Sequence, residues 1–410
     1  MQGFTKCSVK ENGMKTGYIL MVAGVLCSAG VWADTFTHRT SKTVYHGYAT
    51  QTVTDGKTLV HIQPDGPMEL NLAEFDIVSD RNGRNNTISV IPVKDAIQYE
   101  LETNAFEKAM VDESNKGPLF VLIEIDSPGG NTGLAERMCS AITNTRNCRT
   151  VAFIHGGANG GAYSAAAAVT LACNEIYMAP AASIGAATQY VRSSSGRIYD
   201  MKAAFGENIG EKFQSVWRNF LAALAQQNGR SGLVAKAMVD KDIEVLQVKR
   251  SGETLFIEAH EKIAGDQVVR ILCKKGEVMT LPASDAATCT IADAVVETRA
   301  ELLKRLECPD AEVTVNPDMD AAKEELEKVI QRFNKLNSNL EMKYKELELK
   351  AKAGSMTKSQ LVKDFQSLVK NGEYLLKLKQ SYPDVPAEEE DIQDFVNDMK
   401  ATYQGIKSMR

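Results

Sequence analysis

The sequence predicts an α/β protein with a parallel-sheet core, a small β module before it and a helical region after it. Three observations support this: strand and helix patterns alternate in the middle of the chain, short turn-rich strands precede them, and a Glu-, Lys- and Leu-rich composition follows. Alternation of strands with helices is typical of a parallel sheet covered on both faces. With 410 residues, the chain is long enough for two or three domains.

The composition is that of a globular protein and excludes several classes. Hydrophobic residues make up 44% of the chain and charged residues 24%, which argues against disorder, a fibre or a multi-span membrane protein. The net charge of −6 offers no concentrated basic patch, so no nucleic acid partner is expected. The cysteines form no CxxC pair, and we expect no metal and no cofactor.

The first 33 residues have the pattern of a secretory signal peptide. Lys15 precedes an apolar run from Tyr18 to Trp32, and Val31 and Ala33 occupy the small-residue positions before a cleavage site. An uncleaved anchor is the alternative, but the run is short for a membrane span, which needs about 20 apolar residues. We therefore expect cleavage after Ala33 and export to the periplasm or cell envelope.

Cysteine usage is compatible with an exported protein but does not define a disulfide framework. Of eight cysteines, Cys7 and Cys27 would be removed with the signal peptide, and the even number that remains permits disulfides. The nearest pairs along the chain are Cys139 with Cys148 and Cys273 with Cys289. The sequence does not fix the connectivity.

Shifts in pattern divide the chain into four segments. We expect a signal peptide over 1–33, a small β module over 34–85, an α/β domain over 86–306 and a helical, partly coiled-coil-like region over 307–410. In the β module, period-two alternation between Asp-Gly turns predicts short hairpins. In the α/β domain, strands are expected at 88–93, 119–126, 150–155 and 175–180, and helices at 106–115, 134–142 and 162–173. Its continuous apolar strands are typical of strands buried on both faces.

The helical region has two interpretations. Val329, Phe333, Leu336 and Leu340 recur at helical spacing, and further amphipathic helices are expected at 358–380 and after Pro386. These stripes either pack on one another within the chain or take part in an intermolecular coiled coil. The heptad pattern is too short to decide between the two.

Two features of the α/β domain suggest acyl-transfer chemistry. The segment Ser127–Gly130 ends a buried strand, and its glycines let backbone N–H groups approach a carbonyl oxygen closely. Ser164 follows a glycine-rich loop and falls in the first turn of an apolar helix, where unpaired N–H groups such as that of Ala165 favour negative charge. The alternative for the Ser127–Gly130 segment is an ordinary turn. The alternative for Ser164 is a small residue that allows tight helix packing.

A serine nucleophile needs a proton acceptor. None of the five histidines follows Ser164 at a spacing that suggests a histidine triad. A lysine can serve if burial leaves its amine neutral. Lys202 and Lys212 follow Ser164, and Lys212 opens a long amphipathic helix; a solvated surface charge is the alternative for each.

These segments resemble the Clp-protease-like serine peptidases of the Clp/crotonase fold. Within that fold, the sequence is similar to signal peptide peptidase A and, more so, to the NfeD-type membrane-associated serine proteases. The resemblance covers roughly residues 88–306 and rests on IDSPGG, on AYSAAAAVTLACNEIYMAP followed by SIGAA, and on a later helical segment ending in NGRS. It implies a serine endopeptidase with a Clp/crotonase-like core, acting on membrane-derived or hydrophobic peptides and assembling into a homo-oligomer.

The resemblance also assigns roles. In those peptidases the serine precedes the proline of the MAP segment by 16 residues, and Ser164 precedes Pro180 by the same number (180 − 164 = 16). The family's lysine base, at the head of the following helix, corresponds to Lys212. The expected oxyanion-hole donors are the N–H groups of Gly129, Gly130 and Ala165.

Several positions depart from the family pattern. Alanines follow Ser164 where the family often has glycine, and the loop before Lys212 is longer than usual, so Lys202 stays a reserve base. Ala187 lies near the place of the Clp-type histidine, which favours a Ser-Lys dyad over a triad. A β-rich insert over 248–273 is also unfamiliar.

Two other functions remain open. A crotonase-type acyl-CoA enzyme would use similar glycine N–H groups, although export separates the protein from a cytoplasmic cofactor. A non-catalytic Clp-fold scaffold would only display the β module and the helical region. Whether the mature protein associates with a membrane is also open.

The signal-peptide pattern yields the first prediction. The mature protein purified from its native source should begin at Asp34, because signal peptidase reads Val31 and Ala33. N-terminal sequencing measures this directly. An intact Met1 or Met14 would show that the segment is not removed.

Overall fold

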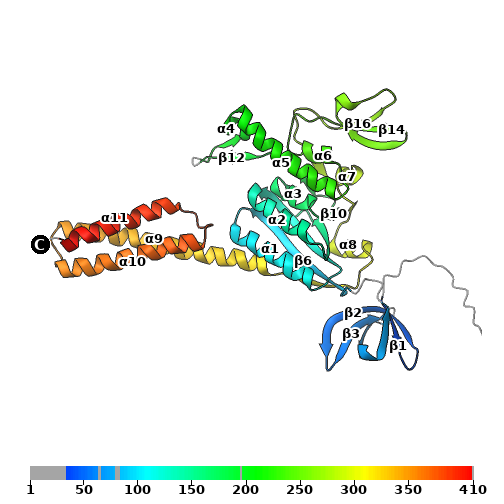
Figure 1. Ribbon diagram of the computed structural model, residues 1–410, viewed down its shortest axis with the longest axis horizontal. Coiled ribbons are helices and arrows are strands. Elements are labelled where there is room, and N and C mark those ends of the chain that lie inside the picture. Colours follow the sequence, from blue (N-terminus) through cyan, green and yellow to red (C-terminus); the bar gives the residue numbers. More distant parts are fainter. Residues whose placement is uncertain (1–33, 63–65, 79–83, 194–195, 409–410) are drawn as a thin grey trace, which may run out of the picture. The chain divides into compact units, whose positions relative to one another are not determined.

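The computed structural model of the protein describes residues 34–62, 66–78, 84–193 and 196–408 (Figure 1). The expected signal peptide lies outside these residues. Within the described ranges, no helix has both the length and the apolar character that a membrane crossing requires.

The N-terminal β module is an antiparallel five-stranded sheet in the order β4-β3-β2-β1-β5. The strands are β1 Asp34–His38, β2 Val44–Thr54, β3 Lys57–Ile62, β4 Gly66–Leu70 and β5 Phe75–Val78. Asp55 and Gly56 both have positive φ, as a tight hairpin between β2 and β3 requires. Phe36, Val60 and Phe75 are buried in its small core.

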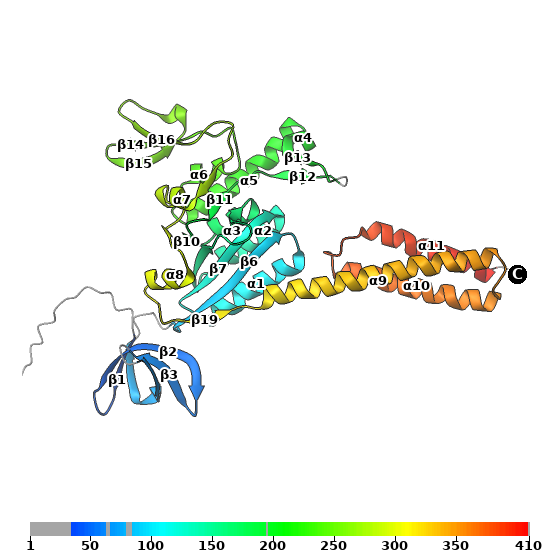
Figure 2. The same cartoon turned by 180° about the vertical axis from the view of Figure 1, so that it is seen from behind.

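The α/β domain is built on a nine-stranded sheet whose central strands are parallel (Figure 2). The strands are β6 Thr87–Ile97, β7 Phe120–Gly130, β8 Arg149–Ile154, β9 Gly161–Tyr163, β10 Glu175–Met178, β11 Ser183–Gly185, β17 Thr280–Pro282, β18 Ala294–Val295 and β19 Glu312–Val315. Only β17 runs antiparallel, against β11. The predicted α/β class with a parallel sheet is confirmed.

The helices of this domain, apart from α4, which has no buried residue, bury a continuous apolar core with the sheet. They are α1 Glu100–Asn115, α2 Thr132–Asn144, α3 Ala165–Leu171, α4 Met201–Phe205, α5 Glu207–Gln227, α6 Gly232–Ala237, α7 Ala283–Thr288 and α8 Arg299–Arg305. Phe106, Met110, Phe120 and Ile123 are fully buried in the core. The long apolar strands are therefore covered, as their sequence predicted.

Three local expectations differ from the structure. The helix expected at 162–173 is only α3, because residues 161–163 form β9 and pair with β11. Strand β7 continues through the SPGG segment to Gly130, since β6 pairs with it to its end. The sheet also extends past Leu306, because β19 pairs in parallel with β6.

Two small antiparallel units branch from the α/β domain. The β-rich insert forms a three-stranded sheet of β14 Val245–Arg250, β15 Glu253–Ile257 and β16 Gln267–Cys273. A two-stranded hairpin, β12 Tyr190–Arg192 and β13 Ile198–Asp200, lies in the chain between Ser164 and Lys212.

The C-terminal helices are α9 Asp318–Lys352, α10 Lys358–Ser381 and α11 Glu389–Ser408. Their apolar stripes share one core around Phe333, Leu340, Phe365 and Val396. The three helices thus pack on one another, which is the first of the two interpretations. The predicted helical region is confirmed.

Neither of the nearest cysteine pairs is bonded. Cys139, Cys148, Cys273 and Cys289 are all unbonded thiols and all buried. The Cys148 thiol donates instead to the carbonyl of Pro118. Burial raises the pKa of Cys139 well above its usual value and that of Cys289 to about 11, so these thiols stay protonated at neutral pH.

Candidate functional site

The end of β7 and the start of α3 meet in the α/β domain. Strand β7 outruns β8 and pairs with β9 through Ser127 and Ala162. This pairing brings Gly129 against Ser164: a Cβ on Gly129 would lie 2.5 Å from the Cβ of Ser164 and 2.8 Å from the nitrogen of Ala165. Only glycine fits such an approach, and the φ of Gly129 is also positive, at 91°.

Ser164 has a strained backbone. Its φ is 54° and its ψ −124°, and it is the N-cap of α3 instead of lying within the first turn. Its N–H donates to the carbonyl oxygen of Gly185 at 2.9 Å. Such conformations of non-glycine residues cost about 1–3 kcal/mol and cluster at active sites. The strain at Ser164 therefore indicates a site at which the surrounding structure imposes the geometry.

The SPGG segment is held by hydrogen bonds that bear on the predicted oxyanion donors. The buried Ser127 donates through Oγ to the carbonyl of Asp95, and Ser127 Oγ accepts the N–H of Gly129 at 3.1 Å. The N–H of Gly129 therefore has an acceptor already. Gly130 packs on β6, since a Cβ there would lie 2.0 Å from the carbonyl oxygen of Ile97.

Lys212 does not have the surroundings that a base requires. It lies on α5, its side chain is exposed, and it makes no ion pair with any described residue. Desolvation is what disfavours an ammonium. The expectation that Lys212 is buried against Ser164 is therefore not met within the single chain.

Lys202, the reserve candidate for the base, is held in its charged ammonium form. Its Nζ lies 2.8 Å from Glu207 Oε1 and 3.2 Å from Glu211 Oε2. Hydrogen bonds to these carboxylates, with that to Glu207 the larger cause, raise the pKa of Lys202 well above its usual value. A lysine held in its charged form cannot accept a proton, so Lys202 is the weaker of the two candidates.

Lys212 instead stands on an exposed apolar surface. We call this the 190–216 surface; its exposed large side chains are Tyr190, Ile198, Tyr199, Phe205, Ile209, Phe213 and Val216. The rings of Phe205 and Phe213 contact each other at 5.5 Å between centroids. Ile209 and Val216 are three and four residues from Lys212 and share its helix face. Lys212 is thus an exposed residue flanked on its helix by the exposed apolar side chains of Ile209 and Val216.

Helix α5 is anchored to the loop after β11. The buried indole of Trp217 donates from Nε1 to the carbonyl of Ala187 at 2.9 Å. Ala187 is itself buried and donates its N–H to the carbonyl of Met238. Ala187, near the place of the Clp-type histidine, is therefore a buried residue whose backbone is hydrogen-bonded at both its N–H and its carbonyl.

Two residues of the NGRS segment fix α3, a role that the sequence did not reveal. Asn228 Nδ2 donates to the carbonyls of Leu171 and Ala172 at the end of α3. The buried guanidinium of Arg230 donates to the next carbonyls, of Cys173 and Asn174, both at 2.9 Å. The sequence signal that could have indicated this role is Arg230, a charged residue that follows the apolar face of α5.

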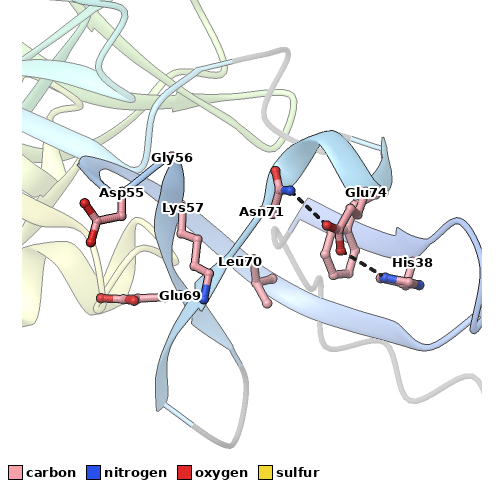
Figure 3. A pocket seen from close by; sticks show the side chains of 9 residues that line it. His38, Asp55, Gly56, Lys57, Glu69, Leu70, Asn71 and Glu74 are labelled. Carbon is pink, nitrogen blue, oxygen red and sulfur yellow. Dashed lines mark hydrogen bonds and ion pairs between the residues drawn. The ribbon is translucent and has the colours of Figure 1, made fainter.

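A separate pocket lies in the β module and contains none of the predicted site residues (Figure 3). Its volume is about 340 Å³, and His38 Nε2 and Glu74 Oε2 are 3.4 Å apart in its wall. Asn71 donates to the other oxygen of Glu74. Across the described residues, no cluster of His, Cys, Asp and Glu could hold a metal ion.

The central segment of the chain matches a known family. Residues 87–268 match the family NfeD1b, N-terminal domain. The predicted NfeD-type resemblance is confirmed. The chain is 25% identical over 252 residues to the membrane protein NfeD1b of Bacillus subtilis (strain 168), which covers 62% of this chain and 48% of the relative. The chain thus spans about half the length of that relative.

The chain is also similar to two solved structures. An alanine variant of 1510-N, a membrane-bound stomatin-specific protease, is 18% identical with a TM-score of 0.42, covering 56% of this chain and 97% of that one. ClpP1 from Listeria monocytogenes is 14% identical with a TM-score of 0.31, covering 51% of this chain and 92% of that one.

The contact between Gly129 and Ser164 yields a stability prediction. Gly129→Ala should lower the free energy of unfolding by about 3 kcal/mol or more, because the new Cβ strains the backbone and overlaps its neighbours. Gly252→Ala is the matched control, since Gly252 has a φ of 90° with nothing within 4 Å of its Cβ position. Urea unfolding should show a loss of about 1 kcal/mol there. Equal losses in both variants would contradict the close approach.

Proposed function

We propose that this chain is a serine endopeptidase with a Ser-Lys dyad, in which Ser164 is the nucleophile and Lys212 the base. The observation that supports the proposal most is the strained backbone of Ser164, held against Gly129 at the end of β7. A nucleophile in a fixed, strained turn presents its hydroxyl in one orientation.

In the proposed reaction, Ser164 Oγ attacks the carbonyl carbon of the substrate peptide bond. The neutral amine of Lys212 accepts the hydroxyl proton and returns it to the leaving amine as the C–N bond breaks. Water then hydrolyses the acyl-enzyme. The N–H groups of Gly130 and Ala165 would stabilise the oxyanion. The N–H of Gly129 can also donate to the oxyanion only if it breaks its hydrogen bond to Ser127 Oγ or is shared between the two acceptors.

The proposed substrates are membrane-derived or hydrophobic peptides. The 190–216 surface supports this class, because clustered exposed apolar side chains mark sites that bind apolar partners. The proposal places the protein in the periplasm or cell envelope, where such peptides arise. The name of the Bacillus subtilis relative, a membrane protein, is compatible with that location.

A homo-oligomer is part of the proposal, because the dyad needs water to be excluded from Lys212. In the single chain Lys212 is exposed on the same helix as the exposed Ile209, Phe213 and Val216. A second copy of the chain, or a hydrophobic substrate, that covers the 190–216 surface would remove that water. The same exposure favours the rival function, a non-catalytic scaffold that never desolvates Lys212.

Hydrolysis of a hydrophobic fluorogenic peptide tests the proposal. The unmodified protein should cleave the peptide, and Ser164→Ala should reduce kcat/KM by about 1,000-fold or more, because the nucleophile is removed. Ser140→Ala is the control, since Ser140 is exposed on α2 and bonds only within its helix. The scaffold function predicts equal background rates in all three proteins.

A further prediction distinguishes Lys212 from Lys202 as the proton acceptor. Lys212→Ala should remove most activity while the protein stays folded, because an exposed residue contributes little to the core. Lys202→Ala should be nearly silent, since surface ion pairs contribute little. Full activity in Lys212→Ala, or loss only in Lys202→Ala, would reject Lys212 as the base.

A further inference from the structure

One buried carboxylate of the α/β domain has no part in the chemistry proposed above. Asp126 is 5% exposed and directly precedes the SPGG segment on β7. No described residue forms an ion pair with it. A buried carboxylate is costly unless it is hydrogen-bonded, so its contacts indicate what it is for.

Asp126 bonds to the glycine-rich loop in both directions. Its two carboxylate oxygens lie 3.2 and 3.1 Å from the backbone nitrogen of Asn159, which donates to them. In return, Asn159 Nδ2 donates to the carbonyl oxygen of Asp126 at 2.8 Å. We call this reciprocal pair the Asp126–Asn159 clamp.

The loop is pressed closely against this clamp. A Cβ on Gly157 would lie 2.4 Å from Asp126 Oδ2, and a Cβ on Gly161 would lie 2.1 Å from the carbonyl oxygen of Ser183. A side chain at position 161 would therefore overlap the backbone, and one at position 157 would displace the Asp126 carboxylate from the clamp. These close contacts hold the loop between β7 and β11. The loop leads through the three residues of β9 to Ser164.

We propose that the Asp126–Asn159 clamp is a positioning device for Ser164. The strained φ of 54° persists only if the backbone is fixed on both sides. On one side, Ser164 donates its N–H to Gly185 and α3 follows. On the other side, the clamp fixes the loop that leads into β9. This inference rests on the proposed function, and it assigns Asp126 and Asn159 no contact with substrate.

The carboxylate is the suitable group for this task. A charged acceptor makes a stronger hydrogen bond to a backbone N–H than a neutral one does. An amide at position 126 would offer one oxygen and turn an NH₂ group toward the N–H of Asn159. Asp126→Asn therefore keeps the volume of the side chain and replaces the charged acceptor with two oxygens by a neutral one with a single oxygen.

The strand itself supplies a matched control. Glu124 lies two residues earlier on β7, is also buried, and accepts two hydrogen bonds from Arg299 on α8. Glu124→Gln weakens a buried carboxylate contact that does not touch the glycine-rich loop. Loss of stability alone should affect both variants, whereas loss of positioning should affect only Asp126→Asn.

Hydrogen exchange tests the clamp without relying on catalysis. In the full-length protein, Asp126→Asn should speed exchange of the Ser164 amide by about tenfold or more, because the loop no longer fixes its bond to Gly185. Glu124→Gln should leave that amide as slow as in the unmodified protein. An unchanged Ser164 amide in Asp126→Asn, or equal acceleration in both variants, would overturn the inference.

Kinetics on the same proteins add the functional readout. With a hydrophobic fluorogenic peptide, Asp126→Asn should lower kcat by about 10–100-fold with little change in KM, because Ser164 is misplaced while the binding surface remains. Asn159→Ala, which keeps the backbone donor, should lower kcat less. Wild-type kcat in Asp126→Asn would also overturn the inference, whereas an inactive unmodified protein would reject the proposed function and leave the exchange result to decide on the clamp.

Discussion

The close approach between Gly129 and Ser164 is the constraint on which the site depends. It requires β7 to extend beyond β8, β9 to take the neighbouring place in the sheet, and a glycine where the two segments touch. Burial of β7 on both faces fixes the strand, and Arg230 and Asn228 fix the far end of α3. The strain at Ser164 is thus maintained by packing at both ends of the segment that carries it.

The elements around this contact were largely predictable from sequence, for physical reasons. The apolar run of β7 predicted a buried strand, although the strand continues through the SPGG glycines to Gly130. The NfeD-type resemblance suggested Ser164. The start of α3 was misjudged, because residues 161–163 pair with β11, a partner that local pattern does not reveal. The roles of Asp126 and Arg230 were also missed, since both act through backbone atoms distant in sequence.

The base depends on a different kind of information. Helix position suggested Lys212, but whether an amine is neutral depends on solvent exclusion, which amphipathic spacing does not report. In the described chain Lys212 is solvated on an apolar face, while Lys202 is held by two carboxylates. The strained geometry of Ser164 therefore belongs to the fold of one chain. The environment of the base depends on whatever covers the 190–216 surface.

The central claim is that Ser164 is a nucleophile, and covalent labelling tests it most directly. The full-length protein would be treated with a fluorophosphonate, digested and analysed by mass spectrometry. The account predicts one modified serine, Ser164, and no label in Ser164→Ala, because the reagent reacts with activated serine hydroxyls. An unlabelled protein, or a label on another serine, would contradict the account.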